Sequence, residues 1–202
     1  MPLRAVAFVA LALCPVWSAP AGAVSLDTLR PQGELMQRWL QMAVATSATA
    51  AALADRIAGG DVIVYLDVRR DLPAGVAAHL TWMAATPTGR IVRVSIRPGQ
   101  RRQDAVGFIA HELQHVVELI DHPDVRSAAD LEALYARIGH RNDRTSRRWD
   151  TVAAIEAGEV ARLEMLAAVD RPGDLAHLQG RNVAMPASGL RVMSGTRAPA
   201  AG

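Results

Sequence analysis

The 202-residue chain contains no lysine, so all 22 of its strongly basic residues are arginine. Arginine keeps its proton near neutral pH, which excludes a lysine general base and a lysine Schiff base. Aromatic residues make up only 4% of the chain, the formal net charge is +2, and no basic stretch is interleaved with aromatics. We therefore expect no nucleic acid partner. Half of the residues are hydrophobic and 21% are charged, which is typical of one folded domain with a real core rather than of a disordered chain.

Cysteine is almost absent as well, and its one occurrence, Cys14, lies in the N-terminal segment. That segment combines a short positive start, an apolar run at 5–13 and a small-residue sequence at 21–23, which is typical of a secretory signal peptide. The apolar run is shorter than the roughly 20 residues that a membrane-spanning helix needs. We predict a signal peptide at 1–23, an exported protein that is periplasmic or secreted, and no stable membrane span after cleavage. A retained membrane anchor and a lipoprotein processed at Cys14 are the alternatives.

Cleavage near Val24 would leave a mature chain without cysteine. Disulfides, which exported proteins can usually form, are then excluded. A cysteine nucleophile and a thiolate zinc site are excluded for the same reason.

Hydrophobic periodicity predicts a single α+β domain at 24–170 that is mainly helical. Helical patterns cover 26–58, 102–120, the stretch from Asp124 or Ser127 to Ile138, and 149–169. In the first of these, Pro31 and Gly33 indicate that the firm helix starts after them. Strand patterns cover 61–68, 79–84 and 91–96, and the last two are separated by the turn sequence at 86–89, which favours a β-hairpin. The remaining residues, 171–202, are rich in Gly, Pro and Ala, and we expect them to form a poorly ordered tail.

The most informative stretch reads HELQH, at residues 111–115 within the helical pattern 102–120. On a helix, His111 and His115 lie one turn apart on the same face and can direct two imidazoles at one metal ion. Zn²⁺ accepts imidazole nitrogen as a ligand. Glu112 follows the first histidine, and its carboxylate can take a proton from a zinc-bound water. The apolar neighbours of the motif indicate a buried helix, and they are Phe108, Ile109, Leu113, Val116 and Val117.

This stretch resembles the HExxH motif of the zincin metallopeptidases, and the resemblance extends from about residue 61 to residue 169. It implies a zincin-like metallohydrolase domain with a small antiparallel sheet beside the HExxH helix. It also implies a Zn²⁺ cofactor and a peptide or protein substrate whose extended backbone pairs with the edge strand of the sheet. Residues 91–96 are the candidate for that edge strand.

A catalytic zinc needs a third protein ligand, and the resemblance suggests two patterns for it. In the metzincin pattern a glycine and then a histidine follow the motif, but here Glu118 and Asp121 occupy those positions. In the gluzincin pattern an acidic residue on a downstream helix is followed three residues later by alanine. Asp150 fits this pattern, with Asp in place of the usual Glu, and Glu156 is the alternative. Glu159 lies on the same predicted helix. We favour Asp150 as the third metal ligand.

Several polar residues outside the motif are candidates for supporting roles. Glu118 lies three residues after His115 and could orient its imidazole, although an exposed helix charge is an equal interpretation. Tyr135, His140 and Arg141 could each approach an oxyanion. His79, on the predicted hairpin, is better explained by ordinary packing.

These observations together predict a zinc-dependent hydrolase, of the peptidase type, in which Glu112 activates a zinc-bound water. One alternative is that the protein has the zincin-like fold but no catalytic activity, and serves as a binding or scaffold domain in the cell envelope. Another is a helical envelope protein in which the HELQH sequence is accidental. The sequence does not identify the substrate or the oligomeric state.

Overall fold

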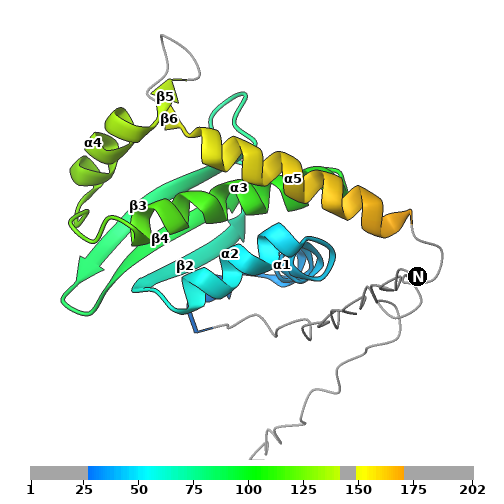
Figure 1. The fold of residues 1–202 in the computed structure, drawn as a ribbon, viewed down its shortest axis with the longest axis horizontal. Helices are drawn as coiled ribbons and strands as arrows, with labels where there is room; N and C mark the ends of the chain where they lie inside the picture. The colour runs from blue at the N-terminus through cyan, green and yellow to red at the C-terminus, as the bar shows by residue number, and fades with distance from the viewer. Residues whose placement is uncertain (1–26, 142–148, 171–202) are drawn as a thin grey trace, which may run out of the picture.

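The computed structural model describes residues 27–141 and 149–170 (Figure 1). Within these residues the chain forms five helices and a small four-stranded mixed sheet, which confirms the predicted α+β class. The predicted signal peptide and the predicted tail lie outside the described residues. None of the described helices is both long enough and apolar enough to cross a membrane.

The sheet has the strand order β1-β2-β4-β3, with bounds β1 Leu29–Pro31, β2 Val62–Val68, β3 Ala78–Thr86 and β4 Gly89–Ile96. The predicted hairpin is present, because β3 and β4 are antiparallel neighbours. However, β2 pairs in parallel with both β1 and β4, so the sheet is mixed and not antiparallel as expected. The short strand β1 was not predicted, and it lies before the helix, which begins at Glu34, just after Gly33, as expected.

The expectation that residues 91–96 form the edge of the sheet is wrong. β4, which contains these residues, is paired on both sides, and β3 lies at the edge. The reason is the distribution of apolar side chains. Alternate residues of β2 and β4 are fully buried, whereas no residue of β3 is classed as buried. The two strands with a continuous apolar face therefore occupy the centre of the sheet.

The single helix predicted from just after Gly33 to residue 58 is divided into α1 (Glu34–Thr46) and α2 (Ala48–Ala58). The break lies at Ser47, whose backbone is extended and whose side chain accepts a hydrogen bond of 2.9 Å from the backbone N–H of Ala50. Serine competes in this way with the helical hydrogen bonds and favours a helix N-terminus. The Ala/Thr/Ser composition around Ser47 gave no sign of the break.

Helix α3 spans Arg102–Ile120, as predicted, and α4 spans Ala128–Ile138 between the N-cap Ser127 and Gly139. Helix α5 spans Val152–Val169 and begins later than the predicted residue 149, because Thr151 forms its N-cap. The residues just before it form β6 (Trp149–Asp150), which pairs with β5 (His140–Arg141). This short ladder pairs the residues on either side of 142–148, a segment that lies outside the described residues.

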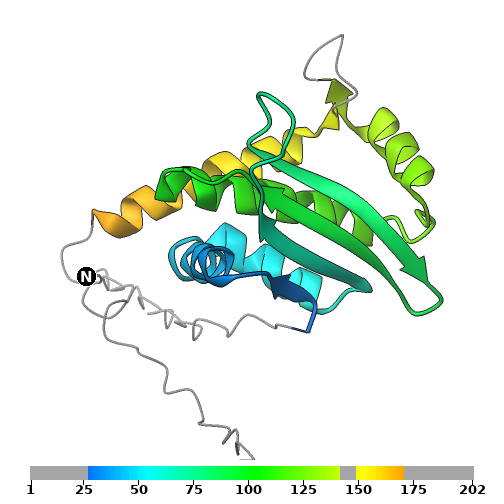
Figure 2. The same ribbon diagram turned by 180° about the vertical axis from the view of Figure 1, so that it is seen from behind.

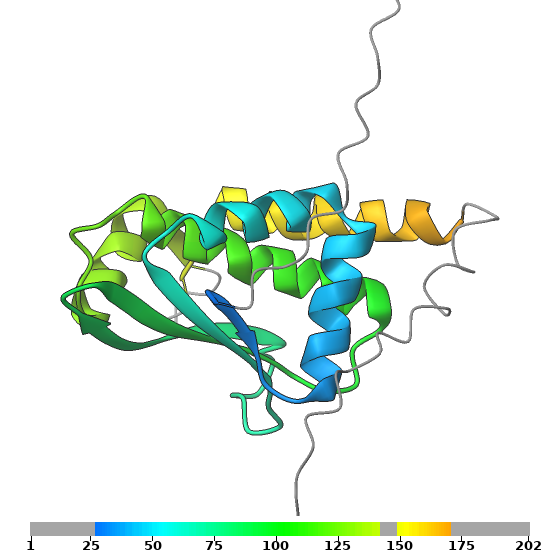
Figure 3. The same cartoon turned by 90° about the horizontal axis from the view of Figure 1, so that it is seen from below.

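Helix α3 is the central element of the molecule. It lies on the sheet, and α2 and α5 lie beyond it on the same side (Figure 3). Figure 2 shows the long β3–β4 hairpin in front of α3. Apolar residues of α3 are fully buried between these layers, among them Ile109, Leu113 and Val116. The HELQH sequence is therefore carried by the most buried helix of the fold.

Candidate metal centre

The three motif residues lie on the side of α3 that faces β3, α4 and β6. Glu112 and His115 are buried, with 4% and 6% of their surface exposed, and the His111 side chain is 22% exposed. The two imidazole rings meet edge to face, with centroids 4.9 Å apart and planes 84° apart. This is the juxtaposition that the four-residue spacing predicts for a helix.

Asp150 joins the two histidines from a distant part of the sequence. Its Oδ1 atom lies 3.3 Å from His111 Nε2 and 3.7 Å from His115 Nε2. The candidate ligand atoms of the three residues all lie within 4.8 Å of one another. Two imidazoles and one carboxylate around a common centre are a donor set that suits a catalytic zinc ion.

The other candidate ligands lie elsewhere. Glu156 is exposed on α5 and is not part of the three-residue group. Glu159 forms an ion pair with Arg162 at 2.8 Å. Asp121, at the C-cap of α3, forms an ion pair with Arg56. Of the carboxylates considered from the sequence, the structure places only Asp150 beside both imidazoles.

Two close backbone approaches bring Asp150 to this position. A Cβ atom at Gly107 of α3 would lie 3.0 Å from the carbonyl oxygen of Gly158, so the pair of glycines lets α3 and α5 cross closely. A Cβ atom at Gly139, just after α4, would lie 2.8 Å from the carbonyl oxygen of Asp150. The first pair of glycines permits the close crossing of α3 and α5, and Gly139 permits the end of α4 to lie against the backbone of Asp150.

The His115 imidazole and backbone are also held by contacts with Glu118 and Tyr135. Its Nδ1 atom lies 2.8 Å from Glu118 Oε2, and the other carboxylate oxygen of Glu118 accepts a hydrogen bond of 2.5 Å from the Thr151 hydroxyl. The Tyr135 hydroxyl donates to the backbone carbonyl of His115 at 3.1 Å, and the Tyr135 ring packs edge-on against the imidazole. Glu118 is thus buried and hydrogen-bonded, and the interpretation of it as an exposed helix charge is wrong.

Of the residues considered for an oxyanion role, Tyr135 lies nearest to the cluster, but its hydroxyl is occupied by the His115 carbonyl. His140 is exposed in β5. The side chain of Arg141 lies outside the described part of the structure. His79 lines the cavity beside the motif rather than packing in the core.

Burial shapes the protonation of the site. Burial raises the pKa of Glu112 to about 7, with Asp150 adding to the effect and His115 opposing it. A carboxyl group with such a pKa can both accept and donate a proton near neutral pH. Burial lowers the pKa of His111, and the neighbouring His115 lowers it further.

His115 behaves differently, because burial alone would lower its pKa but the Asp150 and Glu118 carboxylates outweigh burial and raise the pKa to about 10. The carboxylates around this ring therefore favour a positive charge at the centre of the cluster. A metal cation supplies such a charge, so the electrostatics as well as the donor set fit a metal ion.

A cavity of about 610 Å³ opens over the cluster. Its walls come from the β3 edge and the residues before it, from α3, from α4 and from β6. Glu112, both histidines and Asp150 line it, together with four aromatic rings, namely Trp82, Phe108, Tyr135 and Trp149. Its volume lies in the range of ordinary ligand sites.

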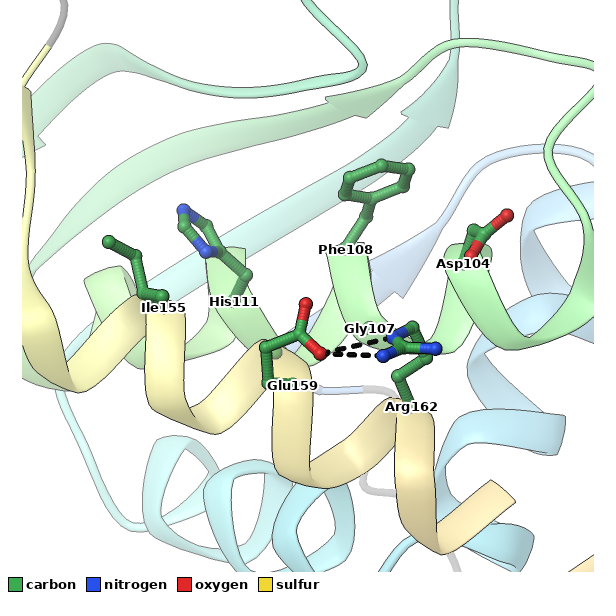
Figure 4. Close-up of a pocket in the computed structure, with 8 residues that line it drawn as sticks. Asp104, Gly107, Phe108, His111, Ile155, Glu159 and Arg162 are labelled. Atoms are coloured by element: carbon green, nitrogen blue, oxygen red, sulfur yellow. Dashed lines mark hydrogen bonds and ion pairs between the residues drawn. The ribbon is translucent and has the colours of Figure 1, made fainter. Parts of the chain in front are cut away.

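A second, smaller pocket of about 260 Å³ lies between α3 and α5 (Figure 4). Its lining includes the Glu159–Arg162 ion pair, drawn as dashed lines, and Asp104. His111 and Phe108 line both this pocket and the large cavity. The first histidine of the motif is therefore accessible from two sides.

No protein-family model matches the chain, and neither a curated protein nor a solved structure matches it.

Proposed function

We propose that this chain is a zinc-dependent hydrolase that cleaves peptide bonds, with His111, His115 and Asp150 as metal ligands and Glu112 as general base. The observation that carries the proposal is the convergence of two imidazoles and one carboxylate beside a buried glutamate at the bottom of a cavity. The resemblance of the HELQH sequence to the zincin motif supports the same assignment.

The three ligands leave room for water in the coordination shell of a catalytic zinc. When bound, Zn²⁺ would supply Lewis acidity, which polarises a carbonyl group and lowers the pKa of water. The Nε2 atoms of His111 and His115 both face Asp150, so these two nitrogens would bind the ion. His115 Nδ1 is occupied by Glu118, which leaves Nε2 for the metal.

Glu112 would act as the proton carrier of the reaction. As a water molecule attacks the carbonyl carbon of the scissile amide, its proton passes to the Glu112 carboxylate. The same proton then passes to the amide nitrogen, the C–N bond breaks, and a carboxylic acid and an amine leave. Burial raises the pKa of Glu112 to about 7 in the absence of a metal ion, and this favours return of the proton, whereas a bound cation would favour the carboxylate that accepts it.

The edge strand β3 would position the substrate. Among the described residues β3 is paired only with β4, and residues 75–82 of this region line the cavity above the cluster. An extended peptide can add to such an edge by backbone hydrogen bonds. This supports a peptide or protein substrate over a small compact one.

The proposal includes export of the protein to the periplasm or beyond, on the basis of the signal-like sequence at 1–23, and a zincin-like domain at 24–170. The proposed reaction uses neither a cysteine thiolate nor a lysine, and the predicted mature chain contains neither residue type.

Metal content tests the proposal directly. Protein purified without added metal should contain close to one zinc ion per chain, and chelation should abolish peptide hydrolysis until zinc is restored. Asp150→Ala should lose the metal, because two imidazoles alone bind it much more weakly. Glu156→Ala, which changes an exposed carboxylate on α5, is the matched control and should keep the metal. Zinc retained in Asp150→Ala would exclude the proposed third ligand, and zinc without hydrolysis of any peptide would favour the inactive scaffold.

A further inference from the structure

Glu118 connects two of the three candidate ligands through hydrogen bonds at both of its carboxylate oxygens. Oε2 lies 2.8 Å from His115 Nδ1, and Oε1 accepts a hydrogen bond of 2.5 Å from the Thr151 hydroxyl. The Glu118 side chain is 10% exposed, and Thr151 is 4% exposed. A carboxylate in such a place must be hydrogen-bonded, because burying an unpaired one is costly.

Thr151, which Glu118 holds in place, is itself hydrogen-bonded to Asp150 and to the first turn of α5. Its hydroxyl accepts a hydrogen bond of 3.1 Å from the backbone N–H of Ala154, which caps α5. Its own backbone N–H donates to Asp150 Oδ1 at 2.9 Å. The residue that Glu118 holds is therefore the one that both begins α5 and orients the Asp150 carboxylate.

Glu118 itself is on the wrong side of the His115 ring to bind the same ion. It contacts Nδ1, whereas Nε2 is the nitrogen that faces Asp150. Metal-binding histidines commonly donate the other ring N–H to a carboxylate, which fixes the ring and its tautomer.

We infer that Glu118 is a positioning residue that assembles the metal site from two distant segments, because one carboxylate fixes the His115 ring and, through Thr151, the segment that carries Asp150. This inference rests on the proposed metal-binding function. The signal in the sequence is the three-residue spacing from His115; the link to Thr151 depends on the fold.

The chain contains a matched control for this arrangement. Glu164 of α5 accepts a hydrogen bond of 2.6 Å from the Ser47 hydroxyl, and Ser47 caps α2 as Thr151 caps α5. Glu118 and Glu164 therefore make the same kind of contact with a helix-capping hydroxyl. Glu164 is not one of the residues that line the cavity or the metal group, so its loss reports the structural effect alone.

The experiment measures the affinity of the purified protein for Zn²⁺ and for Co²⁺ by competition with a chromophoric chelator, together with thermal stability. Glu118→Ala should weaken zinc binding about 10- to 100-fold. Glu118→Gln should weaken it less, because the amide oxygen can still accept from His115 Nδ1–H. Glu164→Ala should lose stability but keep wild-type zinc affinity.

A second pair of variants protects the test against a general folding defect. Thr151→Val should lower zinc affinity, and Thr151→Ser, which keeps the hydroxyl, should restore it. Wild-type zinc affinity in Glu118→Ala, or an equal loss in Glu164→Ala, would overturn the positioning role while leaving the proposed function intact. A wild-type protein that binds neither metal would overturn both.

Discussion

Glu112 differs from the other carboxylates of the site because its side chain accepts no hydrogen bond from the residues that the structure describes. Asp150 and Glu118 are both held by Thr151, through its backbone N–H and its hydroxyl respectively. Glu112 is 4% exposed and borders the cavity. A carboxylate that is desolvated but not committed to a protein donor is suited to accept a proton from water.

Replacing Glu112 with glutamine tests this role by exchanging the carboxylate for an amide. The amide has the same shape but cannot accept the proton, so kcat/KM for peptide hydrolysis should fall at least 100-fold. Zinc content, measured by elemental analysis, should stay at the wild-type level because Glu112 is not a ligand. The control is Glu156→Gln, which removes an exposed carboxylate on α5. Full activity in Glu112→Gln would exclude the residue as the base.

The sequence predicts those parts of the site that depend on residues close together in the chain, and not those that depend on contacts between distant segments. The spacing of His111, Glu112 and His115 predicts their shared face because a helix fixes it. The choice between Asp150 and Glu156 depends on where α5 begins, and that is decided by the Thr151 cap rather than by any periodicity. The sequence favoured Asp150 only through the resemblance, and the link between Glu118 and Thr151 required the fold.

At the scale of elements, α3 and α5 cross closely beside His111, the first candidate metal ligand. A Cβ atom at Gly158 would lie 3.1 Å from the Gly107 carbonyl oxygen and 3.2 Å from His111 Cβ. Both contacts are with rigid parts of α3, so the helices would have to separate.

Gly158→Ala should therefore destabilise the fold and weaken metal binding together. We expect a loss of about 1–3 kcal/mol in the free energy of unfolding, as for other overpacked contacts, and a lower zinc affinity because α5 and Asp150 move with the crossing. Denaturant unfolding and chelator competition measure the two effects. Gly59→Ala is the control, because a Cβ atom there would be in ordinary contact with the Arg56 carbonyl at 3.8 Å. Equal behaviour of the two variants would show that the close crossing is unimportant.

The elements also show what the sequence could not predict. The bounds of α3 were predicted because its apolar face is long and regular, whereas the break between α1 and α2 was missed. The break depends on Ser47, whose hydroxyl is held by Glu164 from the other end of the domain. The parallel pairing of β2 with β4 was also missed, since strands that are not consecutive in sequence carry no local sign of pairing.

At the scale of the whole molecule, the buried Arg90 side chain joins the sheet to the end of the motif helix. It is fully buried, and it donates to the backbone carbonyls of Leu119 at 2.6 Å and His122 at 2.8 Å. Its remaining donors bind Asp61 at 3.0 and 2.5 Å. Arg90 thus adds a charged donor to two carbonyl groups at and just beyond the C-terminus of α3, which also accept backbone hydrogen bonds from His122 and Val125.

The Asp61–Arg90 pair makes the stability of the domain depend on pH. The hydrogen bond from Arg90 is the main cause that lowers the pKa of Asp61 below its ordinary value of 3.8. A carboxyl group with a lowered pKa in the folded state contributes stability above its unfolded pKa, and this contribution is lost as the pH falls through the folded pKa. Asp61→Asn should remove the contribution. The Arg90 side chain is fully buried but the Asp61 side chain is 40% exposed, so solvent screening limits the expected loss near neutral pH to about 1 kcal/mol.

The difference in the free energy of unfolding between wild type and Asp61→Asn should be constant at neutral pH and shrink as the pH falls below about 4. Urea unfolding across this pH range measures it. Asp55→Asn, which changes an exposed aspartate on α2, controls for the loss of one negative charge and should cost little. If the difference in unfolding free energy stayed the same down to the lowest pH, the Asp61–Arg90 pair would not be the origin of the pH dependence. Arg90 contacts the end of α3 and not the face that carries the candidate metal ligands. Asp61→Asn should therefore leave the zinc affinity of the folded protein at neutral pH unchanged, which separates the stability of the fold from the proposed metal binding.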